Sequence, residues 1–385
     1  EMTNTCISKF FPKLLPTLAL PLTLAALPAQ NTGVTFDPNV DGYIEVPYSA
    51  QVVPQSGITF EAWITYDDST LPPGWRYPTI ARQGPTNAGA FNYMLRVNAD
   101  NVGARVLSWW IADSAGTWLT ISWTFAPGQL QTWTHVAATY DGASSNLYVD
   151  GVSVASAVGS GLPLQNPGNE VLRIGKGSDV ATPIEVWNGE IDEVRLWPFA
   201  RTAEDIQRTM NMELSAVPGY VSTWNLNNNF VDTSGAEHGT SSGLVTFTAN
   251  PLALTQPVLA FGIQQGASTP GCDGDLKLSM SGPSEVSYND YRVVCTRAPA
   301  NTLTLWGASG STLPGPLPLL GIDVWVSPLN LIVISGMSDA LGTSSFNLPI
   351  PANVSGFTFA MQCVALDACG PQGFSASDAE LIIIQ

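Results

Sequence analysis

Basic residues are scarce in this sequence. Lysine and arginine together number 14 against 31 acidic residues, which gives the 385-residue chain a net charge of −17. Nucleic acids and anionic membrane surfaces bind proteins through lysine and arginine, which neutralise phosphate groups, so neither is an expected partner. An acidic surface can recruit divalent cations through oxygen ligands, although acidity also serves solubility alone.

Histidines and the common catalytic motifs are also scarce. The histidines are His135 and His238, which are not clustered in the sequence, and the sequence contains no GxGxxG or P-loop motif. A serine hydrolase triad and a zinc site therefore lack parts, and no nucleotide-binding loop is indicated. His135 lies within a strand pattern, where we expect an ordinary sheet residue and not a catalytic base.

Long hydrophobic runs are absent after the first thirty residues. Residues 1–29 contain two lysines before an apolar run from Leu14 to Leu27, and the small residue Ala29 stands where a signal peptidase could cut. A membrane anchor is the alternative, but prolines interrupt the run, which is shorter than the ~20 residues that a span requires. We predict a signal peptide over 1–29, no membrane insertion after its cleavage, and a secreted or cell-surface location.

Cysteine is missing between residues 30 and 250. An even set of four lies in the last third of the chain, and disulfides are expected in an exported protein: Cys272, Cys295, Cys363 and Cys369. The sequence alone does not choose among three pairings. We favour Cys272 with Cys295 and Cys363 with Cys369, because each pair closes the shorter loop. Zinc is the alternative, but no clustered histidines or paired CxxC support it.

Glycine, proline and tryptophan are abundant, with 35, 29 and 12 residues, which is typical of short strands joined by turns. The run ITFEAWITY alternates with period two and places five side chains on one face: Ile58, Phe60, Ala62, Ile64 and Tyr66. HVAATY does the same with Val136, Ala138 and Tyr140. One helix is indicated, TAEDIQRTMNMEL, with Thr202 as N-cap and Asp205 three residues on. This pattern predicts a β-sandwich.

Five sequence blocks resemble segments of a known protein family. They are GYIEVPYS, ITFEAWI, WTHVAATYDGASSNLYVDG, LRIGK and NGEIDEVRLWPFARTAEDI, in this order over residues 33–213. Together they resemble the laminin G-like, concanavalin A-like jelly-roll family of secreted proteins. The resemblance implies two stacked antiparallel sheets, often one calcium ion, and a binding role instead of a catalytic one. GYVSTWNLNNNFVDTSGAEHGT is similar to the segment that flanks such modules, so we expect the domain to cover 30–250.

Residues 257–385 form a second predicted unit. They are similar to C-terminal β-sandwich modules of secreted proteins in some environmental bacteria. Such modules commonly have a second cysteine near LLGIDVWVSP, where this chain has Ile322 and Asp323, so the disulfide pattern of that family is not carried over. The expected fold is all-β, a concanavalin A-like jelly-roll sandwich followed by a second, smaller β-sandwich.

The stretch NGEIDEVRLW raises the question of whether its acids are catalytic. Concanavalin-fold glycosidases carry ExDxE or ExDxxE, and a retaining mechanism needs two carboxyl groups about 5 Å apart. Glu190 and Asp192 fit the first two positions, but the third falls on Val194 or Arg195, and neither can donate the proton. Glu193 would point to the opposite face of a regular strand. We therefore predict no catalytic residue here.

Hydrophobic spacing in the same stretch indicates a β-bulge. Ile191 and Val194 are three residues apart, whereas Val194 and Leu196 are two apart, so the period breaks at Asp192 and Glu193.

A bulge at this position could turn Asp192 toward DPNVDGY, where two more acids lie close to a glycine turn. We predict a structural Ca²⁺ site with Asp37, Asp41 and Asp192 as ligands, because hard oxygen atoms suit calcium. The equal alternative is that Asp192 accepts hydrogen bonds from loop N–H groups.

Aromatic residues in or beside turn-rich segments are the candidate ligand-binding side chains. Trp75 and Tyr77 lie in LPPGWRYP, and Trp110 and Trp118 lie around SWWIADSAGTW. Sugar rings stack on exposed indole faces, which are flat and apolar with a polar edge. The alternative is that these rings pack beneath long loops.

The sequence thus predicts a secreted, non-enzymatic protein that binds a polysaccharide or a cell-surface glycan. A structural surface or matrix spacer is the second interpretation, and a divergent glycoside hydrolase is the third. Glycan binding predicts exposed aromatic rings, a spacer predicts that the same rings are buried, and an enzyme predicts a carboxylate pair about 5 to 9 Å apart in a cleft.

Overall fold

The computed structural model describes residues 31–385 except 56, 68–76, 88–90, 99–104, 167, 180–184 and 256–260. The predicted signal peptide over 1–29 lies outside the described residues. Within the described part of the chain, no helix is both long enough and apolar enough to cross a lipid bilayer.

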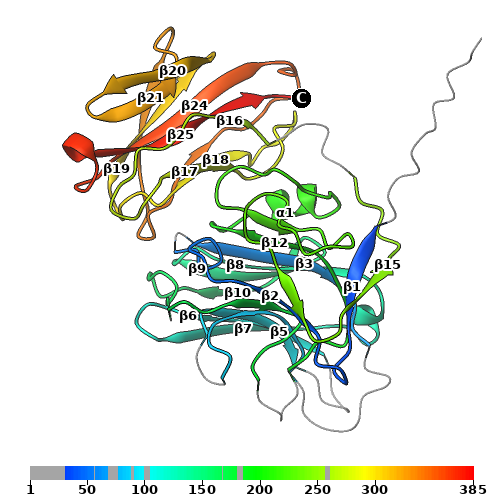
Figure 1. Ribbon diagram of the computed structural model, residues 1–385. Coiled ribbons are helices and arrows are strands. Elements are labelled where there is room, and N and C mark those ends of the chain that lie inside the picture. The colour runs from blue at the N-terminus through cyan, green and yellow to red at the C-terminus, as the bar shows by residue number, and fades with distance from the viewer. Residues whose placement is uncertain are drawn as a thin grey trace, which may run out of the picture. The chain divides into compact units, whose positions relative to one another are not determined.

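Two antiparallel sheets are built from residues 32–249 (Figure 1). The strands of the first sheet lie in the order β10 (Val152–Val158), β9 (Ser144–Val149), β8 (Thr134–Tyr140), β3 (Ile58–Ile64), β12 (Gly189–Trp197), β1 (Thr32–Phe36) and β15 (Thr246–Ala249), with β13 (Ser222–Trp224) also paired to β12. Those of the second sheet lie in the order β14 (Thr240–Ser242), β2 (Tyr43–Val46), β11 (Leu172–Ile174), β4 (Thr79–Gln83), β5 (Tyr93–Asn98), β6 (Val106–Ala112) and β7 (Trp118–Thr124).

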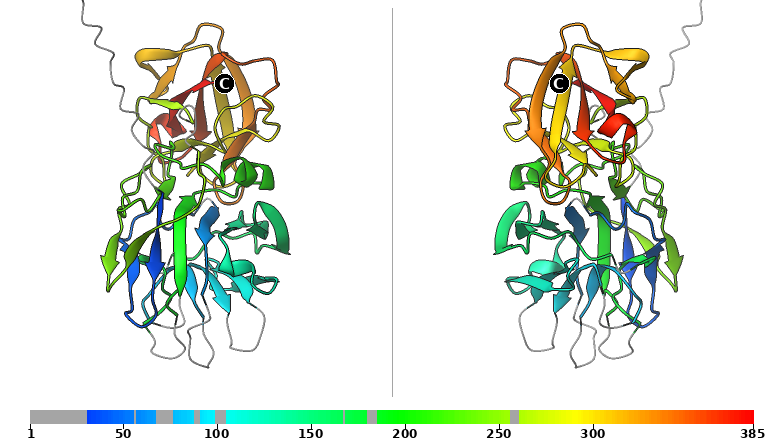
Figure 2. Two further views of the ribbon diagram at one scale, coloured as in Figure 1. Left: turned by 90° about the vertical axis from the view of Figure 1, so that its right-hand side faces the viewer. Right: turned by 90° about the vertical axis from the view of Figure 1, so that its left-hand side faces the viewer.

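Successive strands β1 to β4 alternate between the two sheets, so the chain repeatedly crosses from one layer to the other, as a jelly roll requires. The strands of both layers can be followed from opposite sides in Figure 2. This arrangement confirms the predicted all-β class and the concanavalin A-like jelly roll.

The core of the jelly roll lies between the two sheets. Phe60 and Val136 of the first sheet belong to one buried cluster with Leu95 and Trp109 of the second. All the side chains predicted on the two alternating faces, in 58–66 and in 136–140, belong to this cluster as expected. Burial of each such large side chain contributes about 1.5–3 kcal/mol.

The predicted helix is present but shorter than its sequence pattern. Helix α1 spans Ala203–Thr209, and Thr202 and Asp205 form a complete capping box. The helix ends at Thr209, where the buried Arg195 guanidinium donates to the carbonyl oxygens of Thr209, at 2.9 Å, and of Met212. Two short 3₁₀ segments, Gln129–Gln131 and Pro371–Gly373, are the other helical elements among the described residues.

Residues 263–383 contain three further sheets. The five-stranded sheet has the order β16 (Ile263–Gln265), β25 (Phe374–Ile383), β24 (Thr358–Leu366), β19 (Leu303–Ser309) and β22 (Ile332–Met337). The three-stranded sheet has the order β17 (Lys277–Met280), β18 (Arg292–Thr296) and β23 (Ser344–Asn347), and β20 (Thr312–Leu319) pairs with β21 (Ile322–Val326). These sheets agree with the expected second β-rich part.

A second hydrophobic core joins the five-stranded and three-stranded sheets. Leu278 and Val293 pack with Trp306 and Met361 in this cluster. The same cluster contains residues that follow the long strand β12 of the jelly roll: Phe199, Leu214, Val217 and Val221. The predicted domain limits, 30–250 and 257–385, stay a prediction, and residues 256–260 lie outside the described residues.

Candidate functional site

The outer face of the second sheet displays the side chains that do not enter the core. Leu95 on β5 and Trp109 on β6 are core residues, so strand alternation turns Met94 and Trp110 to the other face. The register pairs Arg82 with Met94 and Met94 with Trp110. These three side chains therefore form one row across β4, β5 and β6.

An aromatic cluster lies at the end of this row. The ring centroid of Phe91 is 4.9 Å from that of Trp118 and 6.3 Å from that of Trp110, and the two indoles are 6.3 Å apart, nearly perpendicular. Phe91 is buried, whereas Trp118 is 50% exposed. The cluster thus combines a buried phenyl ring, Phe91, with an indole that solvent can reach, Trp118.

These rings line a pocket of about 170 Å³. The other lining residues are Arg82, Met94, Arg96, Ser178 and Glu185. Flat aromatic faces beside a few polar groups are the usual composition of a small-molecule or sugar site. The indole Nε1 of Trp110 is buried and has no hydrogen-bond acceptor among the described residues.

The Arg96 guanidinium contacts two aromatic rings. Its central carbon lies 4.4 Å from the Tyr77 ring centroid and 4.8 Å from the Trp110 ring centroid. Burial lowers the pKa of Arg96, although the nearby carboxylate of Glu185 acts in the opposite direction. The Arg96 Nε is buried without a hydrogen-bond partner among the described residues.

Arg82 and Glu185 are tied to the surrounding backbone. Arg82 donates to the carbonyl oxygens of Pro85 and, at 3.0 Å, of Asn87. Burial lowers the pKa of Arg82, and Glu185 again opposes the effect. The Glu185 carboxylate accepts a hydrogen bond from the backbone N–H of Ser178. Both charged groups are therefore fixed in position before any ligand arrives.

The structure brings together three of the four predicted ligand-binding residues. Trp110 and Trp118 line the pocket, and Tyr77 reaches it through its contact with Arg96. Trp75 lies outside the described residues. The sequence analysis missed Phe91 and Arg96. Arg96 carried a usable signal, because it interrupts the apolar pattern of YMLRVN at an outward-facing position.

Two larger cavities lack this composition. One of about 360 Å³ lies among loops that include Arg297 and Leu341. Another of about 470 Å³ is lined almost entirely by apolar side chains, such as Ile332 and Phe357. Neither is lined by a tryptophan.

The three predicted metal ligands are not brought together. Asp37 accepts hydrogen bonds from the backbone and side chain of Asn39, and Asp41 forms an ion pair with Lys176 at 2.8 Å. Asp192 is fully buried, opposite the far end of β1. Among the described residues, no group of metal-ligating side chains includes any of these three acids.

Asp192 instead accepts hydrogen bonds from its neighbours. The side-chain amides of Asn250 and Asn31 donate to it at 2.8 and 3.1 Å, and the backbone N–H of Glu193 donates at 2.8 Å. Burial raises the pKa of Asp192 to about 7, and these donors only partly oppose it. Asp192 thus accepts hydrogen bonds from N–H groups, which was the alternative to a role as a calcium ligand.

The predicted bulge in β12 is confirmed. Asp192 pairs with Trp63 and Arg195 with Glu61, so two residues of β12 face only one of β3, and Glu193 has a φ of 49°.

The other acids of NGEIDEVRLW are also engaged. Glu193 is buried and forms an ion pair with Arg195 at 2.9 Å. Glu190 is half-buried beside Thr35, and burial raises its pKa. These contacts account for the acids of the stretch as structural groups.

Both histidines lie away from the aromatic pocket. His135 is a buried sheet residue whose Nε2 is 3.8 Å from Glu61, and burial lowers its pKa to about 4. His238 accepts a hydrogen bond from the backbone N–H of Asp232 through Nδ1.

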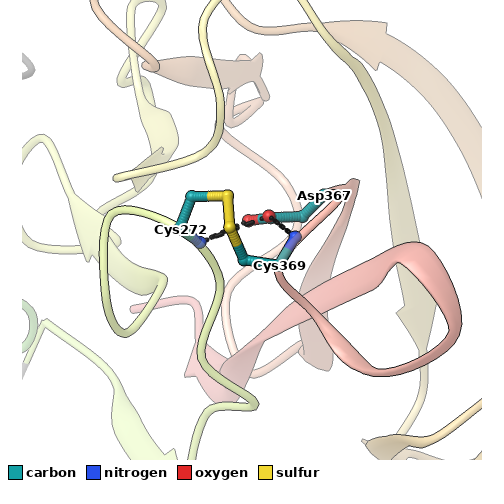
Figure 3. A group of neighbouring side chains, drawn as sticks. All are labelled: Cys272, Asp367 and Cys369. Atoms are coloured by element: carbon teal, nitrogen blue, oxygen red, sulfur yellow. Dashed lines mark hydrogen bonds between the residues drawn. A yellow bond between two sulfur atoms is a disulfide. The ribbon is translucent and has the colours of Figure 1, made fainter.

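The favoured cysteine pairing is wrong. Cys272 is bonded to Cys369 across 97 residues (Figure 3). Cys295 and Cys363 are free and buried. The shorter-loop argument fails because the sheets bring the segment before β17 next to the turn after β24. Asp367 lies at the same place, but both sulfur atoms are used in the disulfide, so these three residues are no zinc site.

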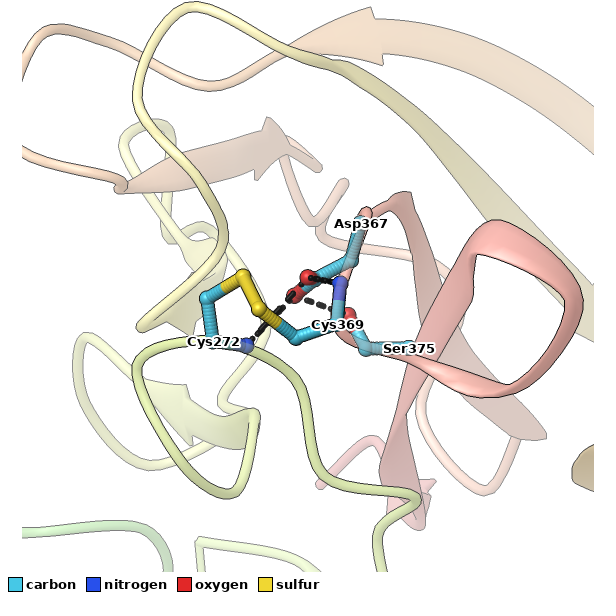
Figure 4. Close-up of a disulfide and its surroundings, with 4 residues drawn as sticks. All are labelled: Cys272, Asp367, Cys369 and Ser375. Atoms are coloured by element: carbon cyan, nitrogen blue, oxygen red, sulfur yellow. Dashed lines mark hydrogen bonds between the residues drawn. A yellow bond between two sulfur atoms is a disulfide. The ribbon is translucent and has the colours of Figure 1, made fainter.

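Asp367 holds the two half-cystines in position. Its carboxylate accepts hydrogen bonds from the backbone N–H groups of Cys272 and Cys369 and from the Ser375 hydroxyl (Figure 4).

Comparisons with known protein families find a match in the first part of the chain. Residues 38–207 match the laminin G-type sequence model of the concanavalin A-like lectin/glucanases superfamily. No curated protein sequence matches this chain.

Several solved structures resemble parts of it. A candidate carbohydrate-binding protein from Bacteroides ovatus is 20% identical over 57% of this chain and 60% of its own length, with a TM-score of 0.44. A heptameric SAP-like pentraxin from Limulus polyphemus is 13% identical over 59% of this chain and 99% of its own, with a TM-score of 0.39. Domain 4 of an extracellular arabinanase from Geobacillus stearothermophilus, in complex with arabinotriose, is 18% identical over 43% of this chain and 71% of its own, with a TM-score of 0.31.

Proposed function

Because residues 38–207 match the sequence model of the concanavalin A-like lectin/glucanases superfamily, we propose that this is a secreted protein whose jelly roll binds a polysaccharide or a cell-surface glycan without cleaving it. The observation that carries the proposal is the aromatic pocket on the outer face of the second sheet, where Phe91, Trp110 and Trp118 meet.

The proposed contact is stacking of a sugar ring on the indoles. A pyranose presents C–H groups on its faces and hydroxyls around its edge, which suits an aromatic surface with polar groups beside it. Trp118 offers an accessible face, and Phe91 beneath it fixes the ring orientation. A pre-positioned ring loses little conformational entropy on binding, so more of the stacking energy appears as affinity.

The exposure of Trp118 favours binding over a purely structural spacer, for which buried rings are expected. The pocket also differs from a glycosidase site, because its lining contains one carboxylate, Glu185, whereas the retaining and inverting mechanisms use two. Asp192 and Glu193 are buried in β12 and unavailable to a polymer.

Calcium is a separate proposal for this domain, and we assign it no ligands. An ion that binds only the folded state would stabilise it by about 2.7 kcal/mol at a hundredfold excess over Kd. Chelation with EDTA would then lower the melting temperature, and an unchanged melting temperature would refute the proposal.

The glycan-binding proposal is tested first by screening the mature protein on a glycan array and then by calorimetry with the best ligand. Trp118→Ala and Trp110→Ala should each weaken binding at least tenfold, or about 1.4 kcal/mol. Trp325→Ala is the matched control, because this half-buried indole lies on β21 in a different sheet and donates to Ala267. It should leave the affinity unchanged.

Glu190→Gln should also bind like the parent. Hydrolysis by the parent that disappears in Glu190→Gln would overturn the non-enzymatic interpretation. Absence of binding to every glycan on the array, or equal loss in the Trp118 and Trp325 variants, would overturn the site.

A further inference from the structure

Arg96 differs from most other basic side chains of this acidic protein. Arg173 on the same sheet lies 2.8 Å from Asp179 and 3.5 Å from Glu45, and Lys176 lies 2.8 Å from Asp41. No carboxylate lies within 4.0 Å of Arg96 among the described residues, although acids outnumber bases by 31 to 14 in the sequence. A cation that forms no ion pair in such a chain is available to a ligand.

The surroundings of Arg96 restrict what it can bind. The centroids of the Tyr77 and Trp110 rings lie 4.4 and 4.8 Å from the central carbon of the guanidinium, so both rings restrict access to it. An acceptor must therefore approach in the guanidinium plane, along the edge that carries the N–H groups. A planar carboxylate fits this approach with two parallel hydrogen bonds, whereas a neutral hydroxyl satisfies only one donor.

The local charge also favours an anion. Arg82 and Arg96 line the pocket together with a single acid, Glu185, so the lining carries one net positive charge. The net charge of −17 would repel an anionic polymer at long range, so attraction must arise from direct contact with Arg96.

We propose that the glycan bound in this pocket is acidic, with a uronic acid carboxylate paired to Arg96 while its sugar ring stacks on Trp118, beside Trp110. This inference rests on the proposed glycan-binding function and specifies the ligand class of the same site. Arg96 is the specificity-determining residue, and the indoles supply affinity for the sugar ring regardless of charge.

The test measures binding affinity for three acidic polymers, polygalacturonate, alginate and hyaluronan. For each of them, a second sample has its carboxyl groups chemically reduced to primary alcohols. This pair keeps the polymer and removes only the charge. We expect at least one of the three acidic polymers to bind, and its reduced form to bind at least tenfold more weakly. Arg96→Gln should bind the acidic and reduced forms equally, and Arg96→Lys should recover only part of the preference, because lysine keeps the charge but loses the planar fork.

Arg173→Gln is the control for general electrostatics, because it removes one positive charge from the same sheet at a residue already paired with acids. It should keep the preference for the acidic form. Binding is compared only for variants whose melting temperature matches that of the parent. If Arg96→Gln does not fold, Arg96→Lys takes its place in the test.

The outcomes separate this inference from the proposed function. Equal binding of acidic and reduced polymers, lost in Trp118→Ala, would overturn the carboxylate assignment and leave glycan binding intact. Tighter binding of dextran sulfate than of all three uronic acid polymers would overturn the carboxylate in favour of sulfate. A parent protein that binds no glycan of any charge would overturn both.

Discussion

At the scale of single residues, the protein buries charged groups in two different ways. Glu61 is fully buried, yet Arg201 donates to it at 2.8 Å, Trp197 at 3.0 Å, and Arg195 lies 3.6 Å away. Burial would raise the pKa of Glu61, but the two arginines outweigh burial and lower it. Removal of one partner from such a group is costly, because a buried charge is left uncompensated.

Glu380 is the opposite case. Its carboxyl group is fully buried, and neither oxygen has a hydrogen-bond partner among the described residues. Burial, with a smaller contribution from Asp378, raises the pKa of Glu380 to about 9 from 4.5. The folded state therefore binds one more proton than the unfolded state between these values, and stability falls as pH rises through that window.

We predict that Glu380→Gln removes this pH dependence. The free energy of unfolding of the parent, relative to Glu380→Gln, should fall by on the order of 3 kcal/mol between pH 5 and pH 8, as measured by urea unfolding. Asp275→Asn, at an exposed acid, is the control and should keep the slope of the parent. A difference between parent and Glu380→Gln that is the same at both pH values would contradict the prediction.

At the scale of elements, the packing of two sheets decides the state of the cysteines. Cys295 on β18 and Cys363 on β24 come from the three-stranded and five-stranded sheets and meet in the core between them. A hydrogen bond to Cys363, together with burial, raises the pKa of the Cys295 thiol. A protonated, buried thiol is a poor nucleophile, so both residues should be unreactive in the native protein.

Alkylation should therefore label no cysteine in the native mature protein and two after unfolding without reductant. Mass spectrometry of peptides should place both labels on Cys295 and Cys363 and recover Cys272 linked to Cys369. No label after unfolding would mean that the two buried thiols had formed a second disulfide. Cys272→Ser removes the Cys272–Cys369 disulfide. It should lower the free energy of unfolding by about 2–5 kcal/mol, because the bond closes a loop of 97 residues.

At the scale of the whole molecule, residues 31–385 form one compact unit. The Trp197 ring, at the end of β12, contacts Phe261 with centroids 6.1 Å apart, and both belong to the second core. Arg201 donates to the carbonyl oxygen of Ser281 at 2.9 Å, and Tyr288 donates to Asp205 on α1. These contacts connect the jelly roll to the strands that follow it.

Calorimetric unfolding of residues 31–385 should accordingly give one transition, with equal calorimetric and van't Hoff enthalpies. The physical reason is that separation of the two parts would expose the shared apolar cluster and leave the Arg201 guanidinium without Ser281. Two resolved transitions, each two-state, would show that the parts unfold independently and would refute this expectation.

The sequence by itself determined the features that depend on a few neighbouring residues. The alternating faces of β3 and β8, the capping box at Thr202 and the bulge at Asp192 and Glu193 were all predicted correctly. Side-chain alternation and helix capping act within three or four residues, so they can be recognised in the printed order.

Tertiary structure alone decided which distant residues meet. It paired Cys272 with Cys369, separated Asp37 and Asp41 from Asp192, and placed Phe91 and Arg96 beside Trp110 and Trp118. These contacts depend on the order and register of strands that are far apart in the chain, and on the burial that follows. A period of two says which face a side chain takes, but not which strand lies next to it.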